Sequence, residues 1–243
     1  MSRILYELVG ADPEIRFSPH CWKARMALAH KGLETETRPW RFVDKTDLAF
    51  SGQDKVPVLV DGEQVIADSW QIACYLERRY PDAPSLFSPA QADEVSIGNA
   101  MPLVQLINAW VDTQLIPTAL PLFLMDIHAY LDEPSQAYFR QSRERRFGKA
   151  LEAVGRHRDE HFERLAQVLT PIRLILQQRP FLAGPKPGYA DYAVFGTFMW
   201  CRAVSDVALV ATDSPIHAWQ ERLLDAFDGL ARRAKRAMAT GQR

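Results

Sequence analysis

A serine followed by a proline stands at the predicted start of the first helix, where its hydroxyl could act on a sulfur atom. The segment is Phe17-Ser18-Pro19-His20-Cys21. Serine is a preferred N-cap residue, and proline is favoured at the first helical position. A helix start also carries unpaired N–H groups and about half a positive elementary charge. Ser18 is therefore either a plain N-cap or a group that stabilises a bound thiolate.

The possible effect on a thiol is large enough to matter. A free thiol has a pKa of about 8.5 and is mostly protonated at neutral pH. A hydrogen bond to a charged group contributes about 1.5–3 kcal/mol, and a helix N-terminus contributes about 0.3–1 kcal/mol. Since one pKa unit corresponds to about 1.4 kcal/mol, the two effects can lower the pKa of a thiol by about one to three units. Thiolate would then be the main species near pH 7.

Cys21 is the alternative reactive group of this segment. Ser-Pro-His-Cys resembles the Cys-Pro-x-Cys motif of dithiol redox proteins, with the nucleophilic first cysteine replaced by serine. That replacement disfavours dithiol redox chemistry. Because a lone cysteine is more often a small buried apolar residue than a nucleophile, we expect Cys21 to be structural.

The segment Lys55-Val56-Pro57-Val58 could hold the backbone of a small peptide. Proline favours an extended conformation in the residue before it, and within a strand pattern it marks an edge or an irregular bond. If the Val56–Pro57 bond is cis, the Val56 N–H and C=O can turn outward and pair with a peptide ligand. Otherwise Pro57 is an ordinary edge-strand proline.

Asp68 and Ser69 open a further predicted helix, and capping is their simplest role. Helix N-termini also bind carboxylates. Ser69 could therefore bond a carboxylate while Asp68 faces an ammonium group. A γ-glutamyl group carries both charges on one carbon, so this pair suits the γ-glutamyl end of a peptide.

The elements that position these segments mix strands and helices in the first part of the chain. Hydrophobic patterns and turn residues predict strands at 4–8, 33–39, 56–60 and 64–67, helices at 19–31 and 69–80, and an irregular loop at 40–54. Helical periodicity then extends over 94–116, 135–178, 189–210 and 215–239, and the stretch 135–178 is expected to form two helices, parted near Gly155 or at Thr170-Pro171. The predicted architecture is α+β, with domains at 1–82 and 93–243 and a Pro- and Ser-rich linker at 83–92.

The composition excludes several classes of function. The 243 residues carry a formal net charge of −1, which gives no field to attract nucleic acid or an anionic membrane. No apolar run approaches the roughly 20 residues of a membrane span, and the N-terminus lacks a secretory signal. The three cysteines and the histidines show no metal-site spacing, so we expect no metal. A cytoplasmic location fits this cysteine usage.

Taken together, the order and spacing of the Ser-Pro, Val-Pro and Asp-Ser segments resemble the glutathione transferase family. The likeness covers almost the whole chain and includes Gly188-Tyr189-Ala190-Asp191-Tyr192. This segment is similar to a buried helix start in that family, where Asp191 would cap the helix and serve folding. The resemblance implies a thioredoxin-like N-terminal domain followed by an all-helical C-terminal domain. It also implies glutathione as co-substrate and a homodimer.

The segments at 18–23, 31–32, 56–58, 68–70 and 142–144 are similar to the bacterial β-etherase branch of the family and its fungal relatives. That likeness implies a role for each motif in binding glutathione. Ser18 would contact the thiol, Val56 and Pro57 the cysteinyl backbone, and Asp68 with Ser69 the γ-glutamyl end. The glycyl carboxylate is assigned to either of two loop residues, Lys45 or Gln53.

A second substrate is expected between the two domains, where small-molecule pockets tend to form. Its lining is assigned to four aromatic residues, Trp22, Trp40, Trp110 and Tyr138. Tyr6 is an alternative contact for the thiol, because other transferase classes use a tyrosine near the end of the first strand. Its place within an apolar run predicts packing instead.

The sequence leaves the reaction open. The favoured interpretation is attack of glutathione on an apolar, aromatic electrophile. Alternatives are cleavage of β-aryl ethers, glutathione-dependent isomerisation as in zeta-like relatives, and a non-catalytic carrier of glutathione or apolar ligands. Thiol–disulfide exchange through Cys21 is disfavoured by the missing first cysteine.

Overall fold

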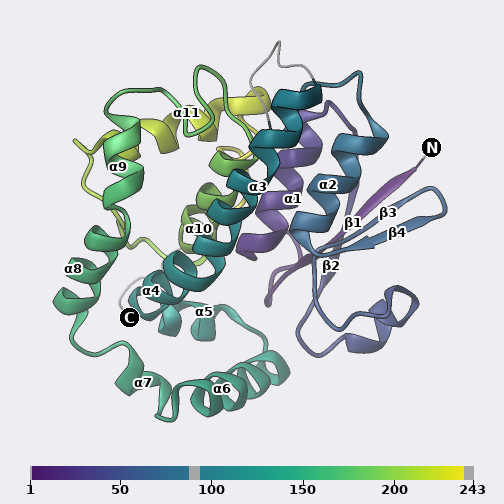
Figure 1. Ribbon diagram of the computed structural model, residues 1–243. Helices are drawn as coiled ribbons and strands as arrows, with labels where there is room; N and C mark the ends of the chain where they lie inside the picture. Colours follow the sequence, from purple (N-terminus) through teal and green to yellow (C-terminus); the bar gives the residue numbers. More distant parts are fainter. Residues whose placement is uncertain (1, 88–93, 238–243) are drawn as a thin grey trace.

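The computed structural model describes residues 2–87 and 94–237 and places a small mixed sheet beside a larger helical part (Figure 1). The strands are β1 (Arg3–Leu8), β2 (Glu36–Trp40), β3 (Val58–Asp61) and β4 (Gln64–Ala67), in the order β2-β1-β3-β4. β1 runs parallel to β2 and antiparallel to β3, and β3 and β4 form a hairpin. The predicted strands are all present, although β2 begins three residues later than expected.

Two helices accompany this sheet, α1 (Pro19–His30) and α2 (Ser69–Arg79). They pack against each other and against the strands. A short 3-10 helix at Lys45–Ser51 lies within the loop predicted after β2. Both predicted helices are confirmed to within one residue at each end.

The rest of the described chain is helical, as expected. Its elements are α3 (Glu94–Trp110), a π-helical turn (Val111–Leu115), α4 (Ile116–Ala119), a 3-10 turn (Leu120–Leu122), α5 (Leu124–Tyr130), α6 (Glu133–Phe147), α7 (Leu151–Val154), α8 (Arg158–Val168), α9 (Thr170–Leu176), α10 (Tyr189–Val204) and α11 (Pro215–Gly229). Of the linker proposed at 83–92, residues 88–92 lie outside the described residues. No helix in the described ranges is both long and apolar enough to cross a membrane.

The prediction of two helices over 135–178 was wrong. The chain forms α6, α7, α8 and α9 there, with breaks at Gly148, near Gly155 and at Leu169-Thr170. Gly148 has a φ of +67°, a left-handed conformation that ends α6 and that glycine adopts without steric cost. The helix predicted over 215–239 is also shorter: α11 ends at Gly229, with a kink of non-helical backbone angles at 226–228, and residues 230–237 are not helical. Residues 238 and 239 lie outside the described residues.

Helix α10 is the centre of the helical part and joins it to the sheet domain (Figure 1). Almost all of its side chains are buried, and it packs against both α1 and α3. Gly196 allows this approach, since a Cβ atom built there would lie 2.4 Å from the carbonyl oxygen of Pro19. Pro19 directly follows Ser18, so this contact also fixes the start of α1.

The substitution Gly196→Ala should therefore lower the free energy of unfolding by about 1–3 kcal/mol, the usual cost of overpacking a core. Chemical denaturation at pH 7 measures the change. Gly155→Ala is the matched control, because its Cβ would lie 3.4 Å from the nearest atom and its φ of −81° suits alanine. Equal stability losses in the two variants would refute the close α1–α10 contact as the cause.

Asp191, in the first turn of α10, holds together the approach to that helix. Its fully buried carboxylate accepts hydrogen bonds from the backbone N–H groups of Leu182 at 2.7 Å, Ala183 at 3.1 Å and Gly188 at 3.0 Å. The indole N–H of Trp219 donates a fourth bond at 2.8 Å. The capping role predicted for Asp191 is confirmed.

Candidate functional site

Ser18 lies where the loop after β1 turns into α1. The backbone N–H of Phe17 bonds the carbonyl of Leu8 at 3.3 Å and brings the chain back to the end of the strand. Ser18 then caps α1, with its Oγ accepting a hydrogen bond from the Cys21 N–H at 3.3 Å. A hydroxyl can accept and donate at once, so this cap leaves Ser18 able to donate to a ligand.

Ser18 lines a cavity of about 240 Å³ between the sheet domain and the helical part, hereafter the Ser18 cavity. The sheet domain contributes Ser18, His20, Trp40, Asp54, Lys55 and Val56 among others, and the helical part contributes Ile116, Leu120, Tyr138, Phe139, Arg143, Arg146 and Trp200. The lining from the sheet domain thus includes a serine, a histidine and a peptide segment beside apolar and aromatic side chains. The lining from the helical part consists of apolar and aromatic side chains together with two arginines.

Two of the four aromatic residues predicted to line the second-substrate pocket do line the Ser18 cavity, and two do not. Trp40 and Tyr138 line the Ser18 cavity, whereas Trp22 and Trp110 are not among its lining residues. The ring of Trp22 is buried in the core, with its indole N–H bonded to the Arg16 carbonyl at 2.9 Å. Sequence reasoning missed Trp200, which reaches the cavity from α10. No local signal separates it from the core aromatics of that helix.

The Val56–Pro57 and Asp68–Ser69 segments are neighbours in space. The Val56–Pro57 bond is cis, and the Asp68 N–H bonds the Pro57 carbonyl at 3.2 Å. Asp68 caps α2 through its Oδ1, which accepts from the N–H groups of Trp70 at 2.9 Å and Gln71 at 3.1 Å. Asp68 is exposed and Ser69 is buried; Val56 lines the Ser18 cavity, whereas these two do not.

The residues predicted for a glycyl carboxylate lie beside the cavity rather than in its lining. The Lys45 ammonium pairs with Asp54 at 3.3 Å and lies 5.1 Å from the centre of the Tyr138 ring. Gln53 is exposed. Lys55 does line the cavity, next to Val56, and sequence reasoning gave it no role. Its place directly before the Val-Pro pair was the signal that could have identified it.

A polar cluster lies behind His20, on the side of α1 that faces α3. The buried Lys23 ammonium donates to Asn108 Oδ1 at 2.9 Å and to Asp112 Oδ1 at 2.6 Å. His20 Nδ1 lies 3.7 Å from the same Asp112 oxygen. Burial and the Lys23 ammonium both lower the pKa of His20, so its ring is neutral at pH 7. Asp112 belongs to the π-helical turn, a feature often found at functional sites.

Neither Cys21, the alternative reactive thiol, nor Tyr6, the alternative contact for the glutathione thiol, is placed for these roles. Cys21 is fully buried, and burial together with the Glu7 carboxylate raises the pKa of its thiol to about 12. Tyr6 packs against Phe50, with ring centres 5.5 Å apart, and does not line the Ser18 cavity. Within the described ranges, no group of three or more His, Cys, Asp or Glu side chains could hold a metal ion.

Comparison with known families identifies this arrangement. A family model described as the glutathione S-transferase N-terminal domain matches residues 13–84. A second model, described as the glutathione S-transferase C-terminal domain, matches residues 103–227. The chain belongs to the glutathione S-transferase family. The two matches fall on the sheet domain and on the helical part, which together form the Ser18 cavity.

Individual relatives agree with that assignment. A probable glutathione S-transferase of Oryza sativa subsp. indica is 32% identical over 101 residues, which are 40% of this chain and 44% of the relative. A glutathione S-transferase-like protein of Aspergillus flavus is 29% identical over 147 residues, 55% of this chain and 49% of the relative. The chain thus spans about half the length of the curated relatives it matches.

Solved structures of fungal family members share the fold. A glutathione transferase of Phanerochaete chrysosporium superposes with a TM-score of 0.78 at 24% identity, over 92% of this chain and 96% of that one. A glutathione S-transferase of Ceriporiopsis subvermispora, solved in complex with glutathione, gives 0.76 at 23% identity over 94% and 97%. The predicted α+β architecture, a thioredoxin-like domain followed by an all-helical domain, is confirmed.

Proposed function

We propose that this protein is a glutathione transferase in which Ser18 stabilises the glutathione thiolate for attack on an apolar, aromatic electrophile. One observation carries the proposal. Ser18, at a helix N-terminus, and Val56 line the same cavity as the aromatic residues of the helical part. The arrangement offers one region to a thiol peptide and an adjacent region to an aromatic compound.

Glutathione would lie along the sheet domain. Its sulfur would face Ser18, its cysteinyl backbone Val56 and Pro57, and its γ-glutamyl end the start of α2 at Asp68 and Ser69. The hydrogen bond between the Asp68 N–H and the Pro57 carbonyl supports this order, because it makes the two segments adjacent. We assign the glycyl carboxylate to Lys55, which lines the cavity, in preference to Lys45 or Gln53.

The proposed reaction needs only a thiolate and correct positioning. The glutathione thiol loses its proton to solvent, and the Ser18 O–H donates a hydrogen bond to the resulting sulfur anion. The sulfur lone pair then forms a bond to the electrophilic carbon. In a substitution, the bond from that carbon to the leaving group breaks and its electron pair departs with the group; in an addition, the displaced π pair takes up a proton from solvent. His20 is neutral at pH 7 and adds no positive charge. Stabilisation of the anion therefore comes from Ser18 and the helix start.

Turnover of glutathione with a panel of electrophiles tests this proposal. The panel should contain general aromatic electrophiles beside model β-aryl ethers. Conjugation of the former supports the proposed function, and preferential cleavage of the ethers would favour the etherase alternative. Saturable glutathione binding without turnover of any compound would replace the enzyme by a carrier. The family resemblance also predicts a cytoplasmic homodimer. Analytical sedimentation, which measures the mass of the assembly in solution, tests whether the protein is a dimer.

The Ser18 cavity further favours electrophiles that carry a negative charge. Arg143, Arg146 and Lys55 line it, and the carboxylate in its lining, Asp54, is already paired with Lys45. Arg143 lies over the Phe139 ring at 4.8 Å. Burial and the neighbouring Arg146 lower the pKa of the Arg143 guanidinium, and Tyr138 opposes them. With Lys55 on glutathione, the two arginines remain for the second substrate.

We therefore expect Arg143→Met to raise KM for an electrophile that bears a carboxylate by about tenfold, the lower range for a lost charge-assisted hydrogen bond. KM for a neutral electrophile should change little. Arg145→Met is the matched control, because Arg145 is exposed on the same helix and does not line the cavity. Steady-state kinetics with a matched acid and amide give the comparison. Equal effects on both would refute a charge preference.

A further inference from the structure

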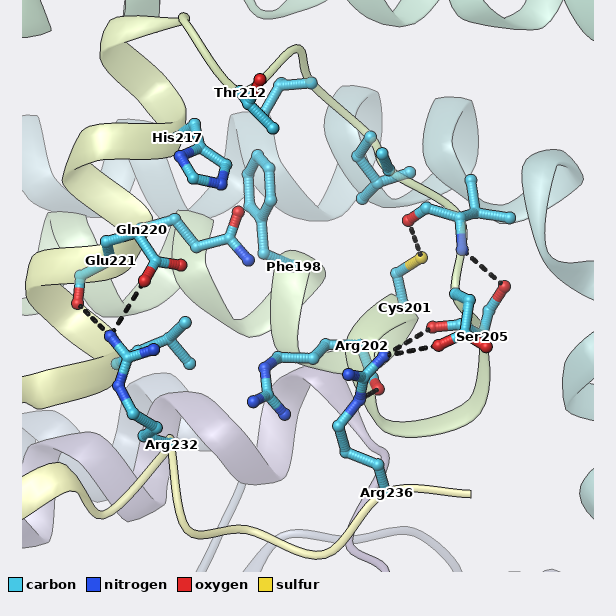
Figure 2. Close-up of a pocket in the computed structure, with 16 residues that line it drawn as sticks. Phe198, Cys201, Arg202, Ser205, Thr212, His217, Gln220, Glu221, Arg232 and Arg236 are labelled. Carbon is cyan, nitrogen blue, oxygen red and sulfur yellow. Dashed lines mark hydrogen bonds and ion pairs between the residues drawn. The ribbon is translucent and has the colours of Figure 1, made fainter. Parts of the chain in front are cut away.

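A second cavity, of about 370 Å³, lies at the C-terminal end of α10 (Figure 2). It is enclosed by the last turn of α10, the segment 205–212, helix α11 and the segment that follows α11. It shares no lining residue with the Ser18 cavity, although both use the end of α10. Trp200 faces the Ser18 cavity, whereas Cys201 and Arg202 line the second one. The proposed transferase reaction makes no use of this space.

Three arginines, Arg202, Arg232 and Arg236, line one side of the second cavity, and two of them are already neutralised (Figure 2). Arg232 pairs with Glu221 at 3.0 Å and also with Asp225. Arg236 pairs with Asp206 at 2.9 Å. The acidic side chains around the cavity are thus taken by these two arginines.

Arg202 differs from its neighbours. Its Nη1 atom is buried and has no hydrogen-bond partner in the part of the chain that the structure describes. Burial and the charges of Arg236 and Arg232 lower the pKa of this guanidinium, with Glu221 opposing them weakly. A buried donor on a charged group is costly to leave unpaired. Arg202 lines the cavity, and its side chain makes no hydrogen bond or ion pair with the other described residues, so its guanidinium can pair with an anion bound there.

The other walls of the cavity are suited to an apolar body. Phe198, Val207, Leu209 and Leu224 line it. His217 and Gln220, on α11, flank Phe198 and face the same space (Figure 2). The volume is at the lower end of the range of about 300–1,000 Å³ that is typical of small-molecule sites. A compound of one or two rings fits this size.

We propose that this second cavity is a binding site for a small organic anion with an apolar body. The single negative charge pairs with Arg202, and the apolar body packs against Phe198 and the aliphatic side chains. This site is separate from the transferase site, so binding here does not depend on whether the protein conjugates glutathione.

Calorimetric titration of the full chain with 2-naphthoate, and with the neutral 2-naphthamide, tests the proposal. We expect saturable binding of naphthoate that is at least about tenfold tighter than that of naphthamide, a difference of about 1.4 kcal/mol. Arg202→Met should weaken naphthoate binding by at least that factor and remove most of its advantage over the amide. In the unaltered protein, added salt should weaken binding of naphthoate more than that of naphthamide, because its binding depends on charge.

Two control variants locate the site. Arg222→Met removes the same charge from α11, but Arg222 bonds the Pro180 carbonyl and does not line the cavity, so it should leave naphthoate binding unchanged. Arg143→Met reports on the Ser18 cavity instead. Naphthoate binding that is lost in Arg143→Met and kept in Arg202→Met would overturn the proposal. So would equal affinity for acid and amide, or no binding of either. Should Arg202→Met fail to fold, the acid–amide comparison and its salt dependence are measured in Arg143→Met, because the Ser18 cavity of the unaltered chain also favours an aromatic acid; a preference for the acid that is lost there would overturn the proposal.

Discussion

Replacing Asp191 by alanine should lower the free energy of unfolding by about 3–5 kcal/mol, because it removes the acceptor of several buried donors at once. The backbone N–H groups of Leu182, Ala183 and Gly188 and the indole of Trp219 would all lose their partner. Burial raises the pKa of the Asp191 carboxyl, so its desolvation offsets part of what these bonds contribute. Chemical denaturation followed by circular dichroism measures the net loss.

The matched control for this change is Asp159→Ala. Asp159 is also acidic and in the first turn of a helix, α8, but it is exposed. Its loss should cost less than about 1 kcal/mol. If Asp191→Ala does not fold, Asp191→Asn keeps one acceptor oxygen and should show an intermediate loss. A loss for Asp191→Ala no larger than that for Asp159→Ala would contradict the role of its four bonds.

A second large effect is expected on the rate of glutathione conjugation when Ser18 is replaced. Ser18→Ala should slow glutathione conjugation by about 10- to 100-fold at pH 7, the kinetic equivalent of a lost hydrogen bond to a charged sulfur. Affinity for glutathione should remain mostly intact, since the peptide contacts lie elsewhere. The deficit should shrink as the pH rises through about 8.5, where a thiol ionises without help. Rate constants measured from pH 6 to pH 9 with one electrophile show this dependence.

Ser214→Ala separates this effect from the loss of a helix cap. Ser214 also precedes a proline and caps its helix, α11, with its Oγ accepting from the Ile216 N–H at 3.2 Å. It does not line the Ser18 cavity. Both alanine variants should lose about 1 kcal/mol of stability from the missing cap. Only Ser18→Ala should lose activity; equal rates in the two variants would show that Ser18 acts solely as a cap.

The parts of this site that were predicted from sequence are those set by local chemistry. Each of the three pairs marks a helix start or a strand edge within two residues: Ser18 with Pro19, Val56 with Pro57, and Asp68 with Ser69. Ser18 and Val56 line one cavity, and the Asp68 N–H bonds the Pro57 carbonyl. The short strands and their hairpin were found in the same way. Such signals depend on backbone geometry, which neighbouring residues largely determine.

What could not be predicted depends on contacts between distant segments. Trp22 and Trp200 both lie on buried helices, and only the packing of α1 against α10 decides that the first is core and the second faces the cavity. The breaks that divide residues 135–178 were underestimated because several short helices and two long ones share the same periodicity. The unpaired state of Arg202 requires knowing that Arg232 and Arg236 capture the nearby carboxylates, which no spacing in the sequence reveals.

We propose that Ser18 lowers the pKa of the thiol of bound glutathione. Titration of the ultraviolet absorbance of the thiolate, with glutathione bound to the unaltered protein and to Ser18→Ala, measures that pKa directly. We predict a value about one to three units below the free value of about 8.5 in the unaltered protein. In Ser18→Ala it should return most of the way to 8.5. The same thiol pKa in both proteins would show that Ser18 does not activate the thiol.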